Sequence, residues 1–229
     1  MTTMKYTLAA FATGCLLAMA ADANDEVALE GAEPGRWTMD FEAATKLAAE
    51  RELPMMINFT GSDWCGWCKL MDKEVFAKDE WKKFAAEHVV LVTLDFPKDK
   101  SIVPEKFVAR NKKLKEQFGV RGYPTYIVLD SDGETKIGKL GAGKGKTPSS
   151  FIKEFQGVIR MSQKSIDAYA KAHPDQADAY KKAIRNLQNT EQALKDWLAT
   201  KPARNEDNNK KFSEFQERIR KARTALEAF

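Results

Sequence analysis

Short, mostly apolar runs alternate with longer stretches of helical periodicity between residues 37 and 160. Their length and their content of β-branched and aromatic residues predict buried strands at 55–60, 89–94 and 126–129. Apolar residues at helical spacing predict helices over 39–51, 65–76, 79–87, 104–118 and from 148 onward. Ser131-Asp132-Gly133 predicts a hairpin turn leading into a strand at 135–140. The resulting order, α-β-α-α-β-α-β-β-α, predicts an α/β fold with a central mixed sheet and helices on both faces.

The pattern changes near Ser162, where glycine and strand-like runs end. Two narrow apolar seams follow, and their spacings of three, four and seven residues are typical of paired helices. The seams consist of Ile184, Leu187, Leu194 and Leu198, and of Phe212, Phe215, Ile219, Ala222 and Leu226. Lys201-Pro202 and residues 205–209 are predicted to form the turn between them. We therefore expect a folded domain over 37–160 and a helical hairpin extension over 161–229.

The first 23 residues have the pattern of a secretory signal. Lys5 supplies a positive charge, residues 6–21 are apolar or small, and Ala21-Asp22-Ala23 is a small-x-small cleavage site. A retained membrane anchor is the alternative, although the apolar run is short. Lipid attachment at Cys15 is disfavoured, because the apolar run continues beyond it. We expect cleavage near Ala23, a periplasmic or secreted protein, and a flexible leader at 24–36.

Composition excludes several classes of protein. Of the 229 residues 43% are apolar, which is enough for a packed core and argues against disorder. Three cysteines are too few for a disulfide-stapled scaffold, and no apolar run reaches the roughly 18 residues that span a bilayer in a polytopic protein. A net charge of +4 is small for a nucleic-acid binder, so we expect no nucleic-acid partner.

Cleavage of the signal would leave two cysteines, Cys65 and Cys68, separated by Gly66-Trp67. They follow a predicted strand and open a predicted helix, so the first sulfur should face unpaired N–H groups at the positive end of the helix dipole. Such a position lowers a thiol pKa below the ordinary value of about 8.5. Cys65 is therefore the candidate nucleophile and Cys68 the candidate resolving thiol.

Other interpretations of the pair are weaker. A structural disulfide that closes so short a loop constrains the unfolded chain little. A zinc site needs two further ligands, and His88 and His173 are not suitably placed, so we predict no metal and no cofactor. Trp64 and Trp67 fit the rim of a substrate-docking surface, although core packing is the alternative for both.

A second motif, Gly122-Tyr123-Pro124-Thr125, precedes the strand at 126–129. Together with 59–68 and the hairpin at 129–133, it resembles the thioredoxin superfamily, in particular secreted bacterial proteins with a Gly-Ser-Asp-Trp-Cys-x-x-Cys signature. The resemblance covers about 37–156. It implies a thioredoxin-like sheet, a cis bond before Pro124, and a substrate-binding role for Tyr123, Pro124 and the residues around the cysteines, including Gly66.

The chain departs from that family at the buried acid that assists proton transfer to the inner thiol. Allowing one inserted residue, the matching position is Asn58, which cannot ionise. Asp63 and Glu74 are the carboxyl groups considered as substitutes. The dipeptide Gly66-Trp67 also matches no known reductase or oxidase pair, so the direction of electron transfer is not predicted.

Two functions remain as hypotheses. The first is a cell-envelope thiol–disulfide oxidoreductase that exchanges disulfides with protein substrates and is served by a membrane electron donor or an oxidant. The second is a non-catalytic or redox-sensing binding module that uses the C-terminal helices. The helical seam could join two protomers as a dimer, or pack within its own chain, which we favour.

Overall fold

The computed structural model describes residues 27–229, so the predicted signal segment 1–23 lies outside the described residues. Its strands are β1 (Trp37–Thr38), β2 (Met55–Thr60), β3 (Val90–Asp95), β4 (Thr125–Leu129) and β5 (Lys136–Gly141). Its helices are α1 (Phe41–Arg51), α2 (Gly66–Met71), α3 (Asp79–His88), α4 (Glu105–Gln117), α5 (Pro148–Ile159), α6 (Gln163–Ala172), α7 (Ala177–Ala199) and α8 (Glu206–Leu226). A π-helical turn (Asp72–Phe76) continues α2, and a short 3-10 turn (Lys100–Ile102) precedes α4.

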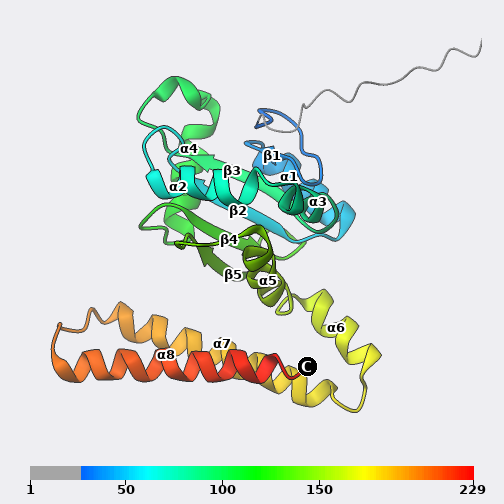
Figure 1. The fold of residues 1–229 in the computed structure, drawn as a ribbon, viewed down its shortest axis with the longest axis vertical. Helices are drawn as coiled ribbons and strands as arrows, with labels where there is room; N and C mark the ends of the chain where they lie inside the picture. The colour runs from blue at the N-terminus through cyan, green and yellow to red at the C-terminus, as the bar shows by residue number, and fades with distance from the viewer. Residues whose placement is uncertain (1–26) are drawn as a thin grey trace, which may run out of the picture.

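The five strands form one mixed sheet in the order β1-β3-β2-β4-β5 (Figure 1). β1 and β2 run parallel to β3, whereas β4 runs antiparallel to both β2 and β5. The three central strands are buried at every position, as expected for strands covered on both faces. The predicted α/β architecture with a central mixed sheet is confirmed.

Alternate residues of the strands enter two separate cores, because successive side chains point to opposite faces. On one face Met56, Leu91 and Tyr126 pack with apolar residues of α3, α5 and the π-helical turn. On the other face Ile57 and Val92 pack with α1 and α4. β2 is therefore packed on both faces, and the cysteine pair follows the carboxyl end of that strand.

The segment from residue 27 to β1 has defined contacts. Ala28 bridges Thr38, and the Thr38 hydroxyl donates a 2.6 Å hydrogen bond to the Gly31 carbonyl. The sequence pattern predicts a flexible leader over 24–36 and no strand at 37–38. Two residues are too few to show a periodic pattern. β1 forms through parallel pairing with the outer edge of β3.

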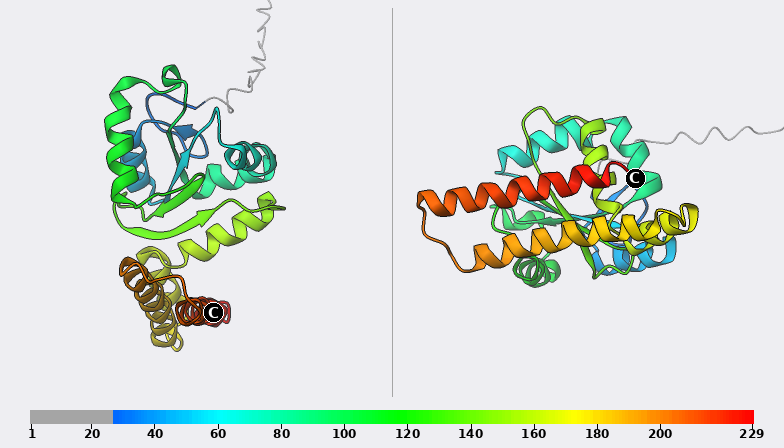
Figure 2. Two further views of the ribbon diagram at one scale, coloured as in Figure 1. Left: turned by 90° about the vertical axis from the view of Figure 1, so that its left-hand side faces the viewer. Right: turned by 90° about the horizontal axis from the view of Figure 1, so that it is seen from below.

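The C-terminal helices form the predicted hairpin. Figures 1 and 2 show α7 and α8 side by side and set apart from the sheet, with α6 leading from α5 into the pair. Ile184 and Leu187 of α7 pack against Ala222 and Leu226 of α8. The turn is shorter than predicted, because Asn205 caps α8 by accepting a hydrogen bond from the Asn208 N–H, so that 206–209 are helical. Among residues 27–229, no helix is both long and apolar enough to cross a membrane.

The hairpin is attached to the end of α5. The Tyr180 hydroxyl donates a 3.0 Å hydrogen bond to the Arg160 carbonyl, and the Arg160 guanidinium donates one of 3.3 Å to the Leu226 carbonyl. Met161 and Tyr169 pack against the same apolar cluster of the hairpin. At the end of the hairpin next to α6, the seam between the long helices is thus covered within one chain, whereas Leu198 near the other end stays 47% exposed.

Candidate active site

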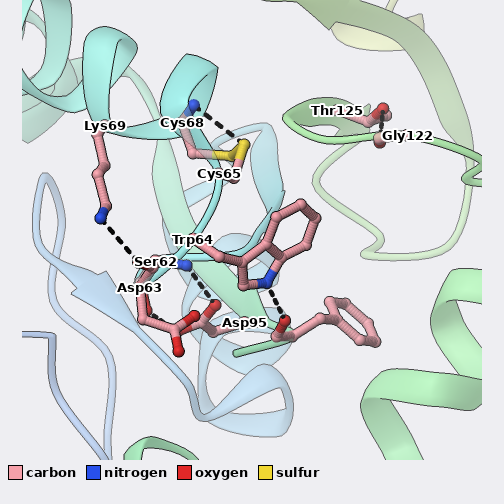
Figure 3. Close-up of a disulfide and its surroundings, with 10 residues drawn as sticks. Ser62, Asp63, Trp64, Cys65, Cys68, Lys69, Asp95, Gly122 and Thr125 are labelled. Carbon is pink, nitrogen blue, oxygen red and sulfur yellow. Dashed lines mark hydrogen bonds between the residues drawn. A yellow bond between two sulfur atoms is a disulfide. The ribbon is translucent and has the colours of Figure 1, made fainter. Parts of the chain in front are cut away.

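The two cysteines lie at the start of α2, as their spacing predicts. Cys65 is the N-cap residue, and its sulfur accepts a 3.2 Å hydrogen bond from the Cys68 N–H (Figure 3). The sulfurs form a disulfide, with Cys65 5% exposed and Cys68 1% exposed. An N-cap sulfur receives the N–H groups that an α-helix leaves unpaired at its first turn. The geometry therefore favours negative charge on Cys65 once the disulfide is reduced.

A tight turn places Cys65 at the carboxyl end of the sheet. The Cys65 N–H donates a 2.8 Å hydrogen bond to the Gly61 carbonyl, and the Ser62 N–H donates one of 2.9 Å to a carboxylate oxygen of Asp95. The Ser62 hydroxyl binds the second oxygen of Asp95. Because Asp95 ends β3, this contact ties the turn to the neighbouring strand.

Asp63 of the same turn faces a different loop. Its carboxylate accepts hydrogen bonds of 2.9 Å from the N–H groups of Lys98 and Asp99. These bonds, chiefly that from Asp99, hold the pKa of Asp63 below its ordinary value, so the group remains ionised near neutral pH. Glu74 pairs with Lys73 at 3.4 Å. Both carboxyl groups considered as substitutes for the buried acid are therefore engaged elsewhere.

Trp64 stands beside the disulfide in a defined orientation. Its indole N–H donates a 2.9 Å hydrogen bond to the Phe96 carbonyl, while 42% of its surface stays exposed. The ring contacts Tyr123 edge-on, with 5.6 Å between centroids. Trp64 is thus anchored and still accessible, a combination suited to contact with a partner.

The Tyr123 loop completes this side of the site. The Tyr123–Pro124 peptide bond is cis, and the turn from Gly122 to Thr125 lies beside the disulfide (Figure 3). The Tyr123 ring also packs on Phe96, and Lys115 of α4 lies 5.1 Å from the Tyr123 ring centroid. Sequence reasoning missed Phe96 and Lys115, since neither belongs to a motif.

The other predicted binding residues lie on α2. Gly66 is its first residue, and a Cβ atom built there would meet nothing within 4 Å, so the space around this position is open. Trp67 is 50% exposed and Leu70 is 36% exposed. The start of α2 and the turn before it therefore carry accessible apolar surface from Trp64, Trp67 and Leu70. No group of three or more metal-ligating side chains occurs among the described residues.

Asn58 lies on β2, on the sheet face that also carries Met56 and is covered by the π-helical turn and α3. It is 5% exposed, and its side-chain oxygen has no hydrogen-bond partner in the described structure. Asp72, the first residue of the π-helical turn, has its pKa raised to about 6 by desolvation and by the charge of Asp95. Sequence reasoning did not single out Asp72, because only the fold brings Asp95 near it.

Comparisons with known proteins agree with this architecture. Residues 41–154 match the sequence model of a family described as a thioredoxin-like domain. Disulfide bond reductase DsbH of Chlamydia pneumoniae is 37% identical over 108 residues, which are 47% of this chain and 63% of the relative. Thioredoxin-related protein DsbJ of the same organism is 32% identical over 115 residues, which are 50% of this chain and 32% of the relative. The matches thus span less than two thirds of either curated relative.

A solved structure of DsbH oxidoreductase is also similar, with a TM-score of 0.50 and 26% identity over 60% of this chain and 88% of that one. With the family match over 41–154 and the cysteine pair opening α2, this likeness shows that residues 41–154 form a domain of the thioredoxin superfamily.

Proposed function

We propose that the protein is a thiol–disulfide oxidoreductase that acts on other proteins. The Cys65 thiolate attacks one sulfur of a substrate disulfide, forms a mixed disulfide, and releases the other substrate sulfur as a thiolate. Cys68, after losing its proton, attacks Cys65 and releases the second substrate sulfur. Two electrons pass to the substrate, and the Cys65–Cys68 disulfide remains. The reaction requires no cofactor.

The position of Cys65 as the N-cap of α2 carries this proposal. The same sulfur receives a helical N–H and lies beside the exposed Trp64 and the Tyr123 loop. A structural crosslink would need neither an open approach nor a rim of accessible aromatic rings. Substrate contacts through Trp64, Gly66, Trp67, Tyr123 and Pro124 are part of the proposal.

We propose the reducing direction, because the relative DsbH is named a disulfide bond reductase. A membrane electron donor would then return the pair to the dithiol. The equilibrium potential against glutathione tests this direction. A potential near about −270 mV supports reduction, and one near about −120 mV supports disulfide donation instead.

Turnover of insulin disulfides, with a small dithiol as electron source, tests the activity. We expect Cys65→Ser to lose all turnover, and Cys68→Ser to accumulate a mixed disulfide that a reducing gel releases. In the uncleaved chain, Cys15→Ser is the matched control and should retain full activity, because Cys15 lies outside the pair. A wild-type chain without turnover would favour the binding-module hypothesis, in which α7 and α8 form the working surface.

We also propose a location in the cell envelope, in the periplasm or outside the cell, on the basis of the signal pattern at 1–23. Fractionation of expressing cells, with sequencing of the mature amino terminus near Ala23, tests this location. The packing of Ile184 and Leu187 against α8 supports a monomer over a dimer joined through the seam. Sedimentation of the purified chain measures the oligomeric state.

A further inference from the structure

Lys115 of α4 is held over two aromatic rings of the candidate site. Its ammonium nitrogen lies 5.1 Å from the ring centroid of Tyr123 and 5.3 Å from that of Phe96. The two rings pack on each other, with 5.4 Å between their centroids. A cation within about 6 Å of a ring centroid is attracted by the negative face of the ring. The two contacts therefore fix the ammonium group beside the Tyr123 loop.

No carboxylate neutralises Lys115 in the described part of the chain. The two rings are its contacts there, and it forms neither an ion pair nor a hydrogen bond. Two carboxylates of neighbouring segments bind backbone N–H groups instead: Asp63 accepts from Lys98 and Asp99, and Asp99 accepts from Ser101. Lys115 is half-buried, and an ammonium group has three N–H donors and no acceptor. Its charge is therefore available to an anionic partner.

The aromatic rings also connect Lys115 to the reactive sulfur. Trp64 precedes Cys65 in the chain, and its ring stands 5.6 Å from that of Tyr123, measured between centroids. The Lys115 ammonium lies 5.1 Å beyond the Tyr123 centroid at most. Since an extended segment advances about 3.3 Å per residue, about three residues of a bound segment span the path from the Trp64 ring to Lys115. A side chain that close to a substrate cysteine can therefore meet this lysine.

A carboxylate is the side chain that such a lysine favours. Hydrogen bonds between an ammonium group and a carboxylate are about twice as strong as those between neutral groups. Ion pairs on a protein surface are weak chiefly because two long side chains must be ordered and because water and salt screen the charges. The rings of Tyr123 and Phe96 already order Lys115. A segment lying over Trp64 and Tyr123 would also exclude part of the surrounding water.

We propose that Lys115 makes the protein select disulfides of substrate proteins that carry Asp or Glu within about three residues of the attacked cysteine. The inference rests on the proposed function and names its substrate class. The substrate carboxylate pairs with Lys115 while the Cys65 thiolate bonds to the substrate sulfur. The substrate S–S bond breaks, and the second sulfur leaves as a thiolate. Lys115 exchanges neither a proton nor an electron, so it is a specificity-determining residue.

Three synthetic peptides of equal length test this selection. Each has one central cysteine that carries a neutral thiopyridyl group through a disulfide. Glu, Gln or Lys occupies the second position on either side of the cysteine. Attack by Cys65 of the reduced full-length chain on the peptide sulfur releases pyridinethione, which stopped-flow absorbance records. The intrinsic reactivity of each peptide cancels when the ratio of two rate constants is compared between variants.

We expect Lys115→Gln to lower the ratio of the Glu-peptide rate to the Gln-peptide rate by about 5-fold, and to raise the relative rate of the Lys peptide. Lys115→Arg should keep the ratio, because arginine retains the charge and also stacks on aromatic rings. Lys113→Gln is the matched control. It removes the same charge from an exposed position of α4, and residues two apart on a helix do not face the same way, so its ratio should match the wild type. In about 1 M salt the wild-type ratio should fall toward that of Lys115→Gln.

An equal ratio in the wild type and Lys115→Gln overturns this inference, including the case in which the variant slows all three peptides alike and the lysine only holds the rings. An equal fall of the ratio in Lys113→Gln also overturns it, because the effect would then be one of net charge. Failure of the proposed function has a different signature. In that case the wild type would react with none of the peptides faster than free cysteine does.

Discussion

Addition of one methyl group at Gly61 should displace Trp64 from its place beside the disulfide. A Cβ atom built on Gly61 would lie 2.5 Å from Cε2 and 2.6 Å from Nε1 of the Trp64 indole. Carbon atoms in contact normally stand about 3.5–4.0 Å apart. In Gly61→Ala the indole must therefore move, and it should lose its hydrogen bond to Phe96 and its edge contact with Tyr123.

The expected cost follows from these two contacts. A hydrogen bond contributes a net free energy of about 0.5–1.5 kcal/mol, and an edge-to-face ring pair about 0.5–1.5 kcal/mol. Because Trp64 is 42% exposed, water replaces part of both contacts. We therefore expect Gly61→Ala to lower the free energy of unfolding by about 1 kcal/mol.

Urea denaturation of a double-mutant cycle measures this coupling. In a Trp64→Ala background the added methyl group has no indole to displace, so Gly61→Ala should then cost little. Gly122→Ala is the matched control, because a Cβ atom there meets nothing within 4 Å. An equal cost of Gly61→Ala with and without Trp64 would refute the displacement, and strain in the turn itself would become the explanation.

Three further predictions concern other parts of the chain. Since the pKa of Asp72 is raised from 3.8 to about 6, the stability linked to its protonated form is complete below about pH 4 and is lost as pH rises through about 6. In urea titrations at pH 8, the free energy of unfolding of Asp72→Asn should therefore exceed that of the wild type by up to about 1 kcal/mol after solvent screening. The two should not differ below about pH 4, and a less stable variant at pH 8 would contradict this sign. Phe76→Ala should lower the free energy of unfolding by about 3–5 kcal/mol in the same assay, because the Phe76 ring centroid lies 5.3 Å from those of both Trp81 and Tyr126. A loss under about 1 kcal/mol would refute tight packing there. Tyr180→Phe should lose about 1 kcal/mol with the bond to Arg160 while insulin turnover stays unchanged, and reduced turnover would link the hairpin to the site.

Much of the fold could be predicted because the central strands are apolar on both faces. β2 and β3 lie where the apolar runs placed them, within one residue. β1 could not be predicted, since Trp37 and Thr38 form a strand only through pairing with Leu91 and Val92. The start of α8 was also misplaced, because the side chain of Asn205 caps a helix that composition alone assigned to a turn.

The candidate site likewise contains residues that could be predicted from local spacing and contacts that only the fold creates. Cys65 and Cys68 could be found from local spacing, because a helix start and a three-residue separation are properties of adjacent residues. The contact between Trp64 and Tyr123 joins residues on different loops, and the Phe96 carbonyl comes from a third segment. Asp72 illustrates the limit most clearly, since its charge depends on Asp95, which ends another strand.

By itself, then, the amino-acid sequence determined the succession of the longer strands and of the helices between them, the pairing of the C-terminal helices and the position of the reactive sulfurs. Each of these depends on periodicity or spacing over a few neighbouring residues. Tertiary structure decided which aromatic rings flank the disulfide, which carboxyl groups are engaged, and which residues line a cavity beside α2. Burial and the electric field at a side chain arise from residues distant in the chain, and only folding brings those residues together.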